Sequence, residues 1–331
     1  MTSRMRRVGG IALTVTLGAL LVLFARHVQW ATVADAVRDA DPALLLLAVA
    51  LNLLSLSAKG LRWWVFLRPL GVRSPWLVLR ATFAGAALNN LVIAQGGEAA
   101  RVMLVSRGSG VPNARVLSAL TLERLLDAMC YVLLLVVATW SLDLGPSLTR
   151  WRGAASVAIG ACAVAIAVLM FAAARHRGRS AASPAPASAG RIASFTKRFL
   201  TGIGDSASPA RVTVAIVLSI VAWSLQVATY HLVARAAHLS LPLAGSIAAM
   251  LTIGLSFLIR ATPGNVGIFQ LTYTLTVGRF GIPEEAAVAV ALLIQAVQVI
   301  PILGMGMGVH MCKRKRLHHD QDCHPPRCDR L

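Results

Sequence analysis

The sequence predicts an all-α, polytopic integral membrane protein with about six spanning helices and two re-entrant hairpins in an inverted repeat. Two observations predict this class. Of the 331 residues, 57% are hydrophobic and only 14% are charged, whereas soluble domains are about 25% charged. Lys and Arg total 32 against 13 Asp and Glu, and this basic excess is unevenly placed. Too little polar sequence remains to build the charge-rich surface of a nucleic-acid-binding protein, so we expect no nucleic-acid partner.

Six apolar runs are near or above the length needed to cross a bilayer, which is at least about 17 residues. The first run follows Arg4, Arg6 and Arg7. It is long for the apolar region of a signal peptide, and no small-residue cleavage site follows it. We therefore expect an uncleaved first helix with its N-terminus inside. The six runs comprise residues 9–25, 42–58, 116–142, 153–174, 212–234 and 286–311.

Two further apolar stretches, residues 76–93 and 243–259, end at glycine-containing breaks. If both form re-entrant hairpins, the inside segments hold 24 Lys and Arg residues and the outside loops hold six, while Arg124 and Arg260 lie in the membrane. Cytoplasmic loops carry the basic excess. We therefore expect a multi-pass protein of the cell inner (plasma) membrane with both termini in the cytoplasm. If residues 76–93 spanned alone, the basic segment 175–211 would move outside.

The positions of the tryptophans agree with these spans. Six of the seven fall near predicted helix ends, where an interfacial aromatic belt is expected. Packing between helices is the alternative for some of them. The six are Trp30, Trp63, Trp64, Trp76, Trp140 and Trp151.

A Ser-, Ala- and Pro-rich segment, residues 180–190, has no hydrophobic periodicity and is typical of a linker. It lies within an expected cytoplasmic linker over residues 175–208. We therefore expect a transmembrane domain over residues 1–311 that consists of two halves, residues 1–142 and 152–311.

The two halves resemble each other. In each, a glycine-containing break leads to a Gly-apolar-Pro sequence and then to a long helix; Gly97 lies 15 residues before Pro112, and Gly267 lies 16 residues before Pro283. Proline suits the start of a helix, where its missing N–H costs nothing. The halves begin on opposite sides of the membrane, as in the inverted repeats of transporters, whose substrate sites lie near the midplane. Coincidence among Gly- and Pro-bounded helices is the alternative.

The break in the first half carries Gly96, Gly97, Glu98 and Arg101. Paired glycines allow a tight turn, and irregular backbone at membrane depth is tolerated only inside protein or beside a wet cavity. The helix that starts near Glu98 presents free N–H groups and a positive dipole end, which would attract an anionic head group. Glu98 can instead cap this helix and pair with Arg101. Two amide side chains precede the turn, Asn89 and Asn90.

A second charged cluster consists of Glu123, Arg124 and Asp127. Their spacings of three and four residues place them on one helix face. Charges at membrane depth cost at least about 2.5 kcal/mol each, so they normally face a polar interior. If this helix begins with cytoplasmic turns, the cluster is merely juxtamembrane.

The second half offers fewer charges. Arg260 precedes Pro263, Gly264 and Gly267, and its guanidinium can hold a phosphate bidentately or extend from the hairpin tip to the interface. Uncharged polar groups follow on the flanking helices, where hydrogen bonding between helices is as strongly indicated as a substrate role. They are Gln270, Gln295 and Gln298.

The tail, residues 312–331, combines a basic run with several His and Cys side chains. No standard zinc-ligand spacing appears, so we expect contact with anionic lipid and neither a metal nor another cofactor. The sequence lacks phosphate-binding, serine-hydrolase, zinc-protease and dinucleotide-binding motifs. We therefore expect no enzymatic activity. A membrane-embedded enzyme with Glu98 or Asp127 as base would need a nucleophile or metal beside the carboxylate, and none stands at convincing spacing.

The clusters described above resemble the transmembrane region of lysylphosphatidylglycerol synthase, a flippase-like domain family. The resemblance lies in Asn89-Asn90, Gly96-Gly97-Glu98-x-x-Arg101, Glu123-Arg124-x-x-Asp127 and Pro263-Gly264-x-x-Gly267. It covers roughly residues 10–310. In two-domain members, a soluble aminoacyltransferase builds aminoacyl-phosphatidylglycerol and the membrane region moves it to the outer leaflet. This chain ends about 20 residues after its last predicted helix, so we expect no synthase activity.

This sequence departs from the family pattern at two positions. The family usually carries a Glu where this chain has Gln270, and an Arg on the last helix near Gln295. The joint loss avoids an unpaired buried charge, which would cost several kcal/mol. A hydrogen bond between the two glutamines would keep the geometry, but ion or proton coupling through that Glu is not expected.

The sequence thus favours a lipid transporter, or flippase, for an anionic or zwitterionic phospholipid or an isoprenoid-linked lipid. Its expected partners are membrane lipids. The first alternative is a non-transporting membrane partner of a separate lipid- or glycan-modifying transferase, and the second is a membrane-embedded lipid-modifying enzyme.

Overall fold

The computed structural model describes residues 29–91, 96–141, 191–206, 208–257 and 265–322, with seven residues between 153 and 164. Every regular element in these ranges is a helix, which confirms the all-α class. The expected first span, most of the span 153–174 and the linker segment 180–190 lie outside the described residues.

Within the described ranges, three helical segments are long and apolar enough to cross a membrane: Pro42–Leu70, Pro209–Ala236 and Glu284–Met305. The expected total of six spans and two re-entrant hairpins stays a prediction. In chain order the described elements are α2 (Trp30–Arg38), α3 (Pro42–Leu67), η1 (Arg68–Leu70), α4 (Pro75–Leu91), α5 (Gly96–Ser109), α6 (Asn113–Ser141), α9 (Arg191–Ser206), α10 (Pro209–Ala236), α11 (Leu243–Ser256), α12 (Ile268–Val277), η3 (Gly278–Phe280) and α13 (Glu284–Asp322).

Helices α3 and α10 begin in the same way. The Asp41 carboxylate precedes Pro42 and accepts the backbone N–H groups of the next two residues at 2.8 and 3.3 Å. The Ser208 hydroxyl precedes Pro209 and accepts the N–H of Arg211 at 3.4 Å. A polar cap satisfies amides that lack a partner in the first turn, and proline sets the helical φ. Both long helices therefore start sharply.

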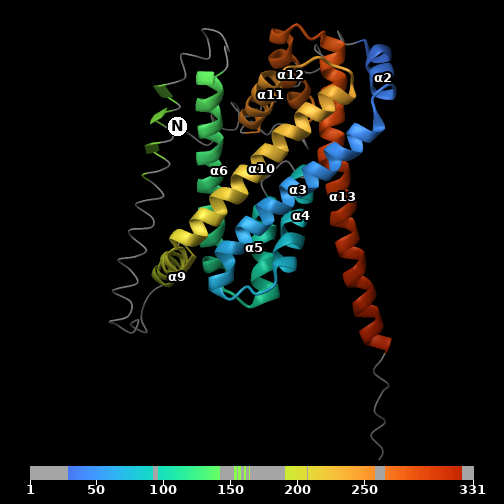
Figure 1. Cartoon of the computed structure of the whole chain (residues 1–331). Coiled ribbons are helices and arrows are strands. Elements are labelled where there is room, and N and C mark those ends of the chain that lie inside the picture. Colours follow the sequence, from blue (N-terminus) through green and yellow to red (C-terminus); the bar gives the residue numbers. More distant parts are fainter. Residues whose placement is uncertain are drawn as a thin grey trace, which may run out of the picture.

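The two helices α3 and α10 lie side by side and run antiparallel through the middle of the molecule (Figure 1). Each is followed by a helical hairpin, α4–α5 after α3 and α11–α12 after α10, and the two hairpins lie toward opposite ends of the bundle (Figure 1). Helix α4 also packs against α13, and α11 against α6. Each hairpin therefore contacts the opposite half of the chain, which is the arrangement that an inverted repeat produces.

The same joint connects each hairpin to the long helix that follows it. Gly110 precedes Val111 and Pro112 with φ +72°, and Gly281 precedes Ile282 and Pro283 with φ +78°. This left-handed backbone favours glycine because a Cβ is strained there. The joints have matching residues and matching conformations, which supports the repeat that the sequence predicts.

The bundle has two main apolar cores, and each one draws residues from both halves of the chain. The first gathers Trp63, Phe66 and Leu67 of α3 against side chains of α4, α5, α6 and α9. The second gathers Tyr230 of α10 with Phe269 of α12 and helices α11 and α13. Trp63 is fully buried, so its expected place in an interfacial belt is wrong: its indole packs inside the bundle. Trp140 and Trp151 lie outside the residues whose side chains are described.

Helix α3 is longer than the apolar run that predicts it. The run ends at residue 58, but the helix continues to Leu67 and carries Lys59 and Arg62 with it. The count of inside basic residues includes Lys59 and Arg62 as flanking charges. The Arg62 side chain is completely buried, so it faces the interior of the bundle and not the aqueous phase.

Residues 191–206 of the expected linker form the helix α9. It packs along α6, and an ion pair of 2.6 Å joins Asp205 to Arg115. Its sequence places Phe195 and Phe199 one turn apart with stacked rings, and Lys197 and Arg198 between them. Such an amphipathic basic helix is typical of a membrane interface.

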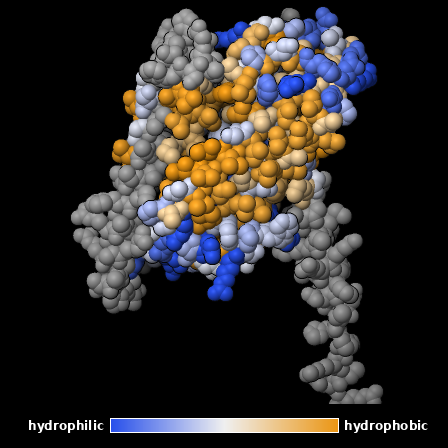
Figure 2. Space-filling view, viewed as in Figure 1, coloured by the Kyte–Doolittle hydropathy of each residue, from blue (hydrophilic) through white to orange (hydrophobic). Residues whose placement is uncertain are grey.

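The outer surface supports a membrane environment. Figure 2 shows a broad apolar band across the face formed by α3 and α10, with hydrophilic residues toward both ends. Exposed apolar side chains of these two helices include Leu46, Leu54, Val217 and Ile220. A continuous patch of this kind is unusual on a soluble monomer and matches the hydrocarbon layer of a bilayer.

Candidate functional site

Three arginines and three carboxylates form one connected network between α3, α5 and α6. Glu123 lies at its centre: one carboxylate oxygen is 3.3 Å from Arg62 and the other is 3.0 Å from Arg101. Both arginine side chains and Glu123 are at most 5% exposed. The six formal charges balance, so the network satisfies the requirement that buried charges be paired.

Arg62 also connects the network to the second half of the chain. One of its Nη atoms lies 2.8 Å from the Asp127 carboxylate, and the other donates a hydrogen bond of 2.8 Å to the Ser219 hydroxyl of α10. Ser219 is fully buried. The guanidinium therefore joins α3, α6 and α10 at one point.

Arg101 occupies a pocket built from four helices. Its guanidinium carbon lies 4.3 Å from the centre of the Trp63 ring, within the range of a cation–π contact. It also lies 3.4 Å from Glu98 and 3.5 Å from the hydroxyl of Thr82 on α4. The predicted pair between Glu98 and Arg101 is present, but Arg101 makes its shorter ion pair with Glu123.

Close backbone contact brings Arg101 into this position. A Cβ on Gly85 would lie 2.3 Å from Arg101 Cγ, and a Cβ on Gly97 would lie 2.1 Å from the Gly85 carbonyl oxygen. Glycines at these two positions let α4 and α5 approach each other. The Asn89 carboxamide oxygen accepts the Gly97 N–H at 3.0 Å, so the hairpin is closed by a side chain. Asn90 instead donates back to Ala86 of its own helix.

The network is exposed along one edge. Arg124 lies 2.8 Å from Glu98 and 3.6 Å from Asp127. Its side chain is 48% exposed, against 27% for Glu98 and 19% for Asp127. Because Glu123 is buried while Arg124 is not, the second cluster is partly interior and partly accessible. An exposed guanidinium next to a carboxylate can exchange that partner for the phosphate of a ligand, to which Arg bonds strongly.

The second half holds a neutral counterpart. The Gln270 amide donates a 2.6 Å hydrogen bond to the Gln295 carbonyl oxygen, and its own oxygen accepts the Gly267 N–H at 2.6 Å. The hydrogen bond between the two glutamines that the sequence suggested is therefore present. It fixes the start of α12 to α13. Arg260, Pro263 and Gly264 lie outside the described residues.

Sequence reasoning missed Arg62, Gly85 and Ser219. Arg62 stands at the polar end of an apolar run, which is also where a cytoplasmic flanking residue stands. Its partners Glu123 and Asp127 are more than 60 residues away, beyond any local pattern. Among the described residues, no group of three His, Cys, Asp or Glu side chains is arranged to hold a metal ion.

Comparisons with known proteins place the chain in a family. A family model for the transmembrane (TM) region of lysylphosphatidylglycerol synthase matches residues 9–306. The glycosyltransferase AglD of Haloferax volcanii is 28% identical over 351 aligned positions, which cover 93% of this chain and 54% of that protein. A UPF0104 membrane protein of Methanothermobacter thermautotrophicus is 31% identical over 130 positions, which cover 38% of each chain.

This chain thus spans about half the length of the first relative and less of the second. The family model, in contrast, covers most of the chain, including every charged residue of the network. The protein therefore belongs to the family of the lysylphosphatidylglycerol synthase transmembrane region.

Proposed function

We propose that this membrane protein moves an anionic or zwitterionic phospholipid, or an isoprenoid-linked lipid, between the two leaflets. The observation that carries the proposal is the network of three arginines and three carboxylates, Arg62, Arg101, Arg124, Glu98, Glu123 and Asp127. It is built where a helical hairpin meets long helices, its six formal charges balance, and it opens to the surface at one edge. Charged groups are rarely kept at such positions in membrane proteins unless they serve transport or binding.

In this proposal Arg124 is the head-group ligand. It is the most exposed of the three arginines, and its contact with Asp127 is the longest in the network. A phosphate can therefore displace the Glu98 and Asp127 carboxylates from Arg124 at a lower free-energy cost than it can displace the buried partners of Arg62 or Arg101. Glu98 then becomes available for the positive group of a zwitterionic head group.

The family supports a lipid substrate, because its model is named after the membrane region of an enzyme of lipid synthesis. We place the protein in the cell inner (plasma) membrane, with the end that bears Arg68, Arg107 and Arg115 toward the cytoplasm, as the basic excess indicates. Labelling single cysteines at positions 107 and 39 with a membrane-impermeant reagent tests this orientation. Only position 39 should react from outside intact cells.

Reconstitution in liposomes tests the transport proposal. Fluorescent phosphatidylglycerol and phosphatidylethanolamine report movement between leaflets through the fraction that an external quencher reaches. The protein should accelerate movement of at least one lipid, and Glu98→Gln and Arg124→Ala should slow it at least tenfold. Arg107→Ala is the matched control, because Arg107 is an exposed arginine on α5 without an ion pair among the described residues. If wild type moves no lipid, transport is refuted; if all variants match wild type, the site is refuted.

The name of the Haloferax relative supports a second candidate. That protein is called a glycosyltransferase and is about twice as long as the part matched here. By analogy, this membrane protein would hold a separate glycan- or lipid-modifying transferase at the bilayer without moving lipid. Cells that depend on the protein distinguish the two candidates: a scaffold retains its function in Glu98→Gln, whereas a transporter loses it.

A further inference from the structure

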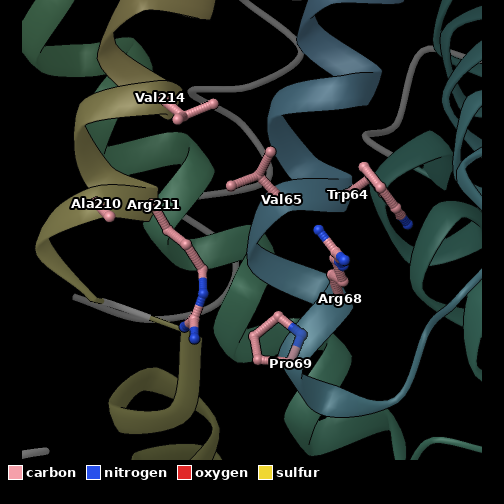
Figure 3. Close-up of a pocket in the computed structure, with 7 residues that line it drawn as sticks. All are labelled: Trp64, Val65, Arg68, Pro69, Ala210, Arg211 and Val214. Carbon is pink, nitrogen blue, oxygen red and sulfur yellow. The ribbon is translucent and has the colours of Figure 1, made fainter.

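A cavity of about 660 Å³ lies between the end of α3 and the start of α10, apart from the charged network. Its lining residues are Trp64, Val65, Arg68, Pro69, Ala210, Arg211 and Val214. Figure 3 shows Val65 and Val214 at one end of the cavity, projecting from α3 and α10. Arg68, the first residue of η1, and Arg211 of α10 lie nearer to the other end. The cavity is therefore amphipathic, with an apolar part and a cationic part.

We propose that this cavity binds an anionic phospholipid, with its phosphate between Arg68 and Arg211 and an acyl chain along Val65 and Val214. The charge composition favours this occupant. Among the described residues neither arginine makes an ion pair, and no carboxylate lines the cavity. A phosphate is thus attracted, whereas the quaternary ammonium of a zwitterionic lipid meets only positive charge.

Both cavity arginines can still donate hydrogen bonds to a phosphate. Arg211 uses one Nη to donate to the carbonyl oxygens of Asp205 and Ser206 at the end of α9, which leaves other N–H groups of its guanidinium. Arg68 lies 5.6 Å from the ring centre of Trp64 and is exposed. The Trp64 indole in turn donates to the Val72 carbonyl oxygen at 3.2 Å, which holds the wall of the cavity in place.

The position of the cavity suits a lipid of the leaflet next to the basic end of the protein. Val214 continues into an exposed apolar face of α10 that includes Val217 and Ile220, so a chain leaving the cavity meets surface that faces hydrocarbon. The amphipathic helix α9, which contacts η1, lies at the polar boundary where head groups are found. Basic pockets between transmembrane helices on this side are suited to anionic head groups.

Native mass spectrometry of the full chain in detergent, titrated with phosphatidylglycerol or phosphatidylcholine, tests the proposal. We expect phosphatidylglycerol to bind at least tenfold more tightly than phosphatidylcholine. Arg68→Gln should weaken phosphatidylglycerol binding about tenfold, or about 1.4 kcal/mol, whereas Arg73→Gln, an exposed arginine nearby that does not line the cavity, should not. Val214→Trp fills the apolar part and should weaken binding, whereas Leu46→Trp, an exposed position near the other end of α3, should not.

Two further measurements separate this site from others. Inorganic phosphate at millimolar concentration should not displace the lipid; if it does, the cavity is a site for free phosphate and the lipid proposal is wrong. In Arg124→Ala one phosphatidylglycerol molecule should still bind, and adding Arg68→Gln should weaken that remaining binding about tenfold, because the cavity shares no residue with the proposed transport site. Equal binding of both lipids, or equal behaviour of Arg68→Gln and Arg73→Gln, overturns the proposal.

Discussion

Glu123 is the residue on which the charged network depends most, and its replacement by Gln tests the whole arrangement. Its two carboxylate oxygens lie 3.3 Å from Arg62 and 3.0 Å from Arg101. At an effective dielectric constant of about 20, each contact contributes about 5 kcal/mol of Coulomb attraction. Much of this offsets the cost of taking the charges out of water. The expected net loss of stability is therefore about 3–5 kcal/mol, as for other buried pairs that lose one partner.

Unfolding in mixed micelles with increasing denaturant measures this loss. The exposed pair of Arg38 and Asp35 provides a matched control, because its separation is also 3.3 Å while both side chains are more than two-thirds exposed. Asp35→Asn should change the free energy of unfolding by less than about 1 kcal/mol.

A double-mutant cycle with Arg62→Met completes the test. Because Arg62 and Glu123 are direct partners, the double variant should be less destabilised than the sum of the two single variants. If Glu123→Gln costs no more than Asp35→Asn, or if the two effects simply add, then Glu123 is not the buried centre of the network and the reasoning fails.

Two further predictions concern the hairpins. Gly97→Ala should destabilise the protein by about 1–3 kcal/mol, because its Cβ would overlap the Gly85 carbonyl oxygen. Gly96→Ala is the control: its Cβ would meet its nearest neighbour at 3.9 Å, so the free energy of unfolding should change by less than about 0.5 kcal/mol. Equal effects in the thermal unfolding of the two variants would contradict the close contact. Gln270→Glu alone buries an unpaired carboxylate and should lower the free energy of unfolding by about 3–5 kcal/mol. Adding Gln295→Arg should restore most of that loss in the same assay. A double variant no more stable than the single one would show that the two side chains do not face each other.

The local features of the fold were predictable from the sequence because they depend on neighbouring residues. The Gly-apolar-Pro joints that end at Pro112 and Pro283 are each encoded within a few positions. The tight turn expected at Gly96 and Gly97 is wrong, because both residues lie in the first turn of α5 and neither has a positive φ. The pairing of Gln270 with Gln295 could also be suggested, because both replace charges that the family usually carries. In the structure these two side chains are hydrogen-bonded.

The centre of the site was not predictable in the same way. A charge that follows an apolar run has the same local pattern whether it faces cytoplasm or protein, so Arg62 could not be told from a flanking residue. Only its ion pairs with Glu123 and Asp127, which lie on the distant helix α6, show that Arg62 faces protein. The same holds for Trp63, which lies near a predicted helix end but packs beside Arg101, and for Gly85, whose role appears only when α5 lies against α4.

The unequal bonding of the two halves also limits how the molecule can move. Sliding α3, α5 or α6 past one another would separate the buried charges of Arg62, Arg101 and Glu123, which have no water to replace their partners, at a cost of several kcal/mol. The matching seam between α12 and α13 is held by a neutral hydrogen bond from Gln270 to Gln295, worth about 0.5–1.5 kcal/mol. Polar bonding therefore resists sliding more strongly among α3, α5 and α6 than between α12 and α13, which apolar packing and one neutral hydrogen bond hold together.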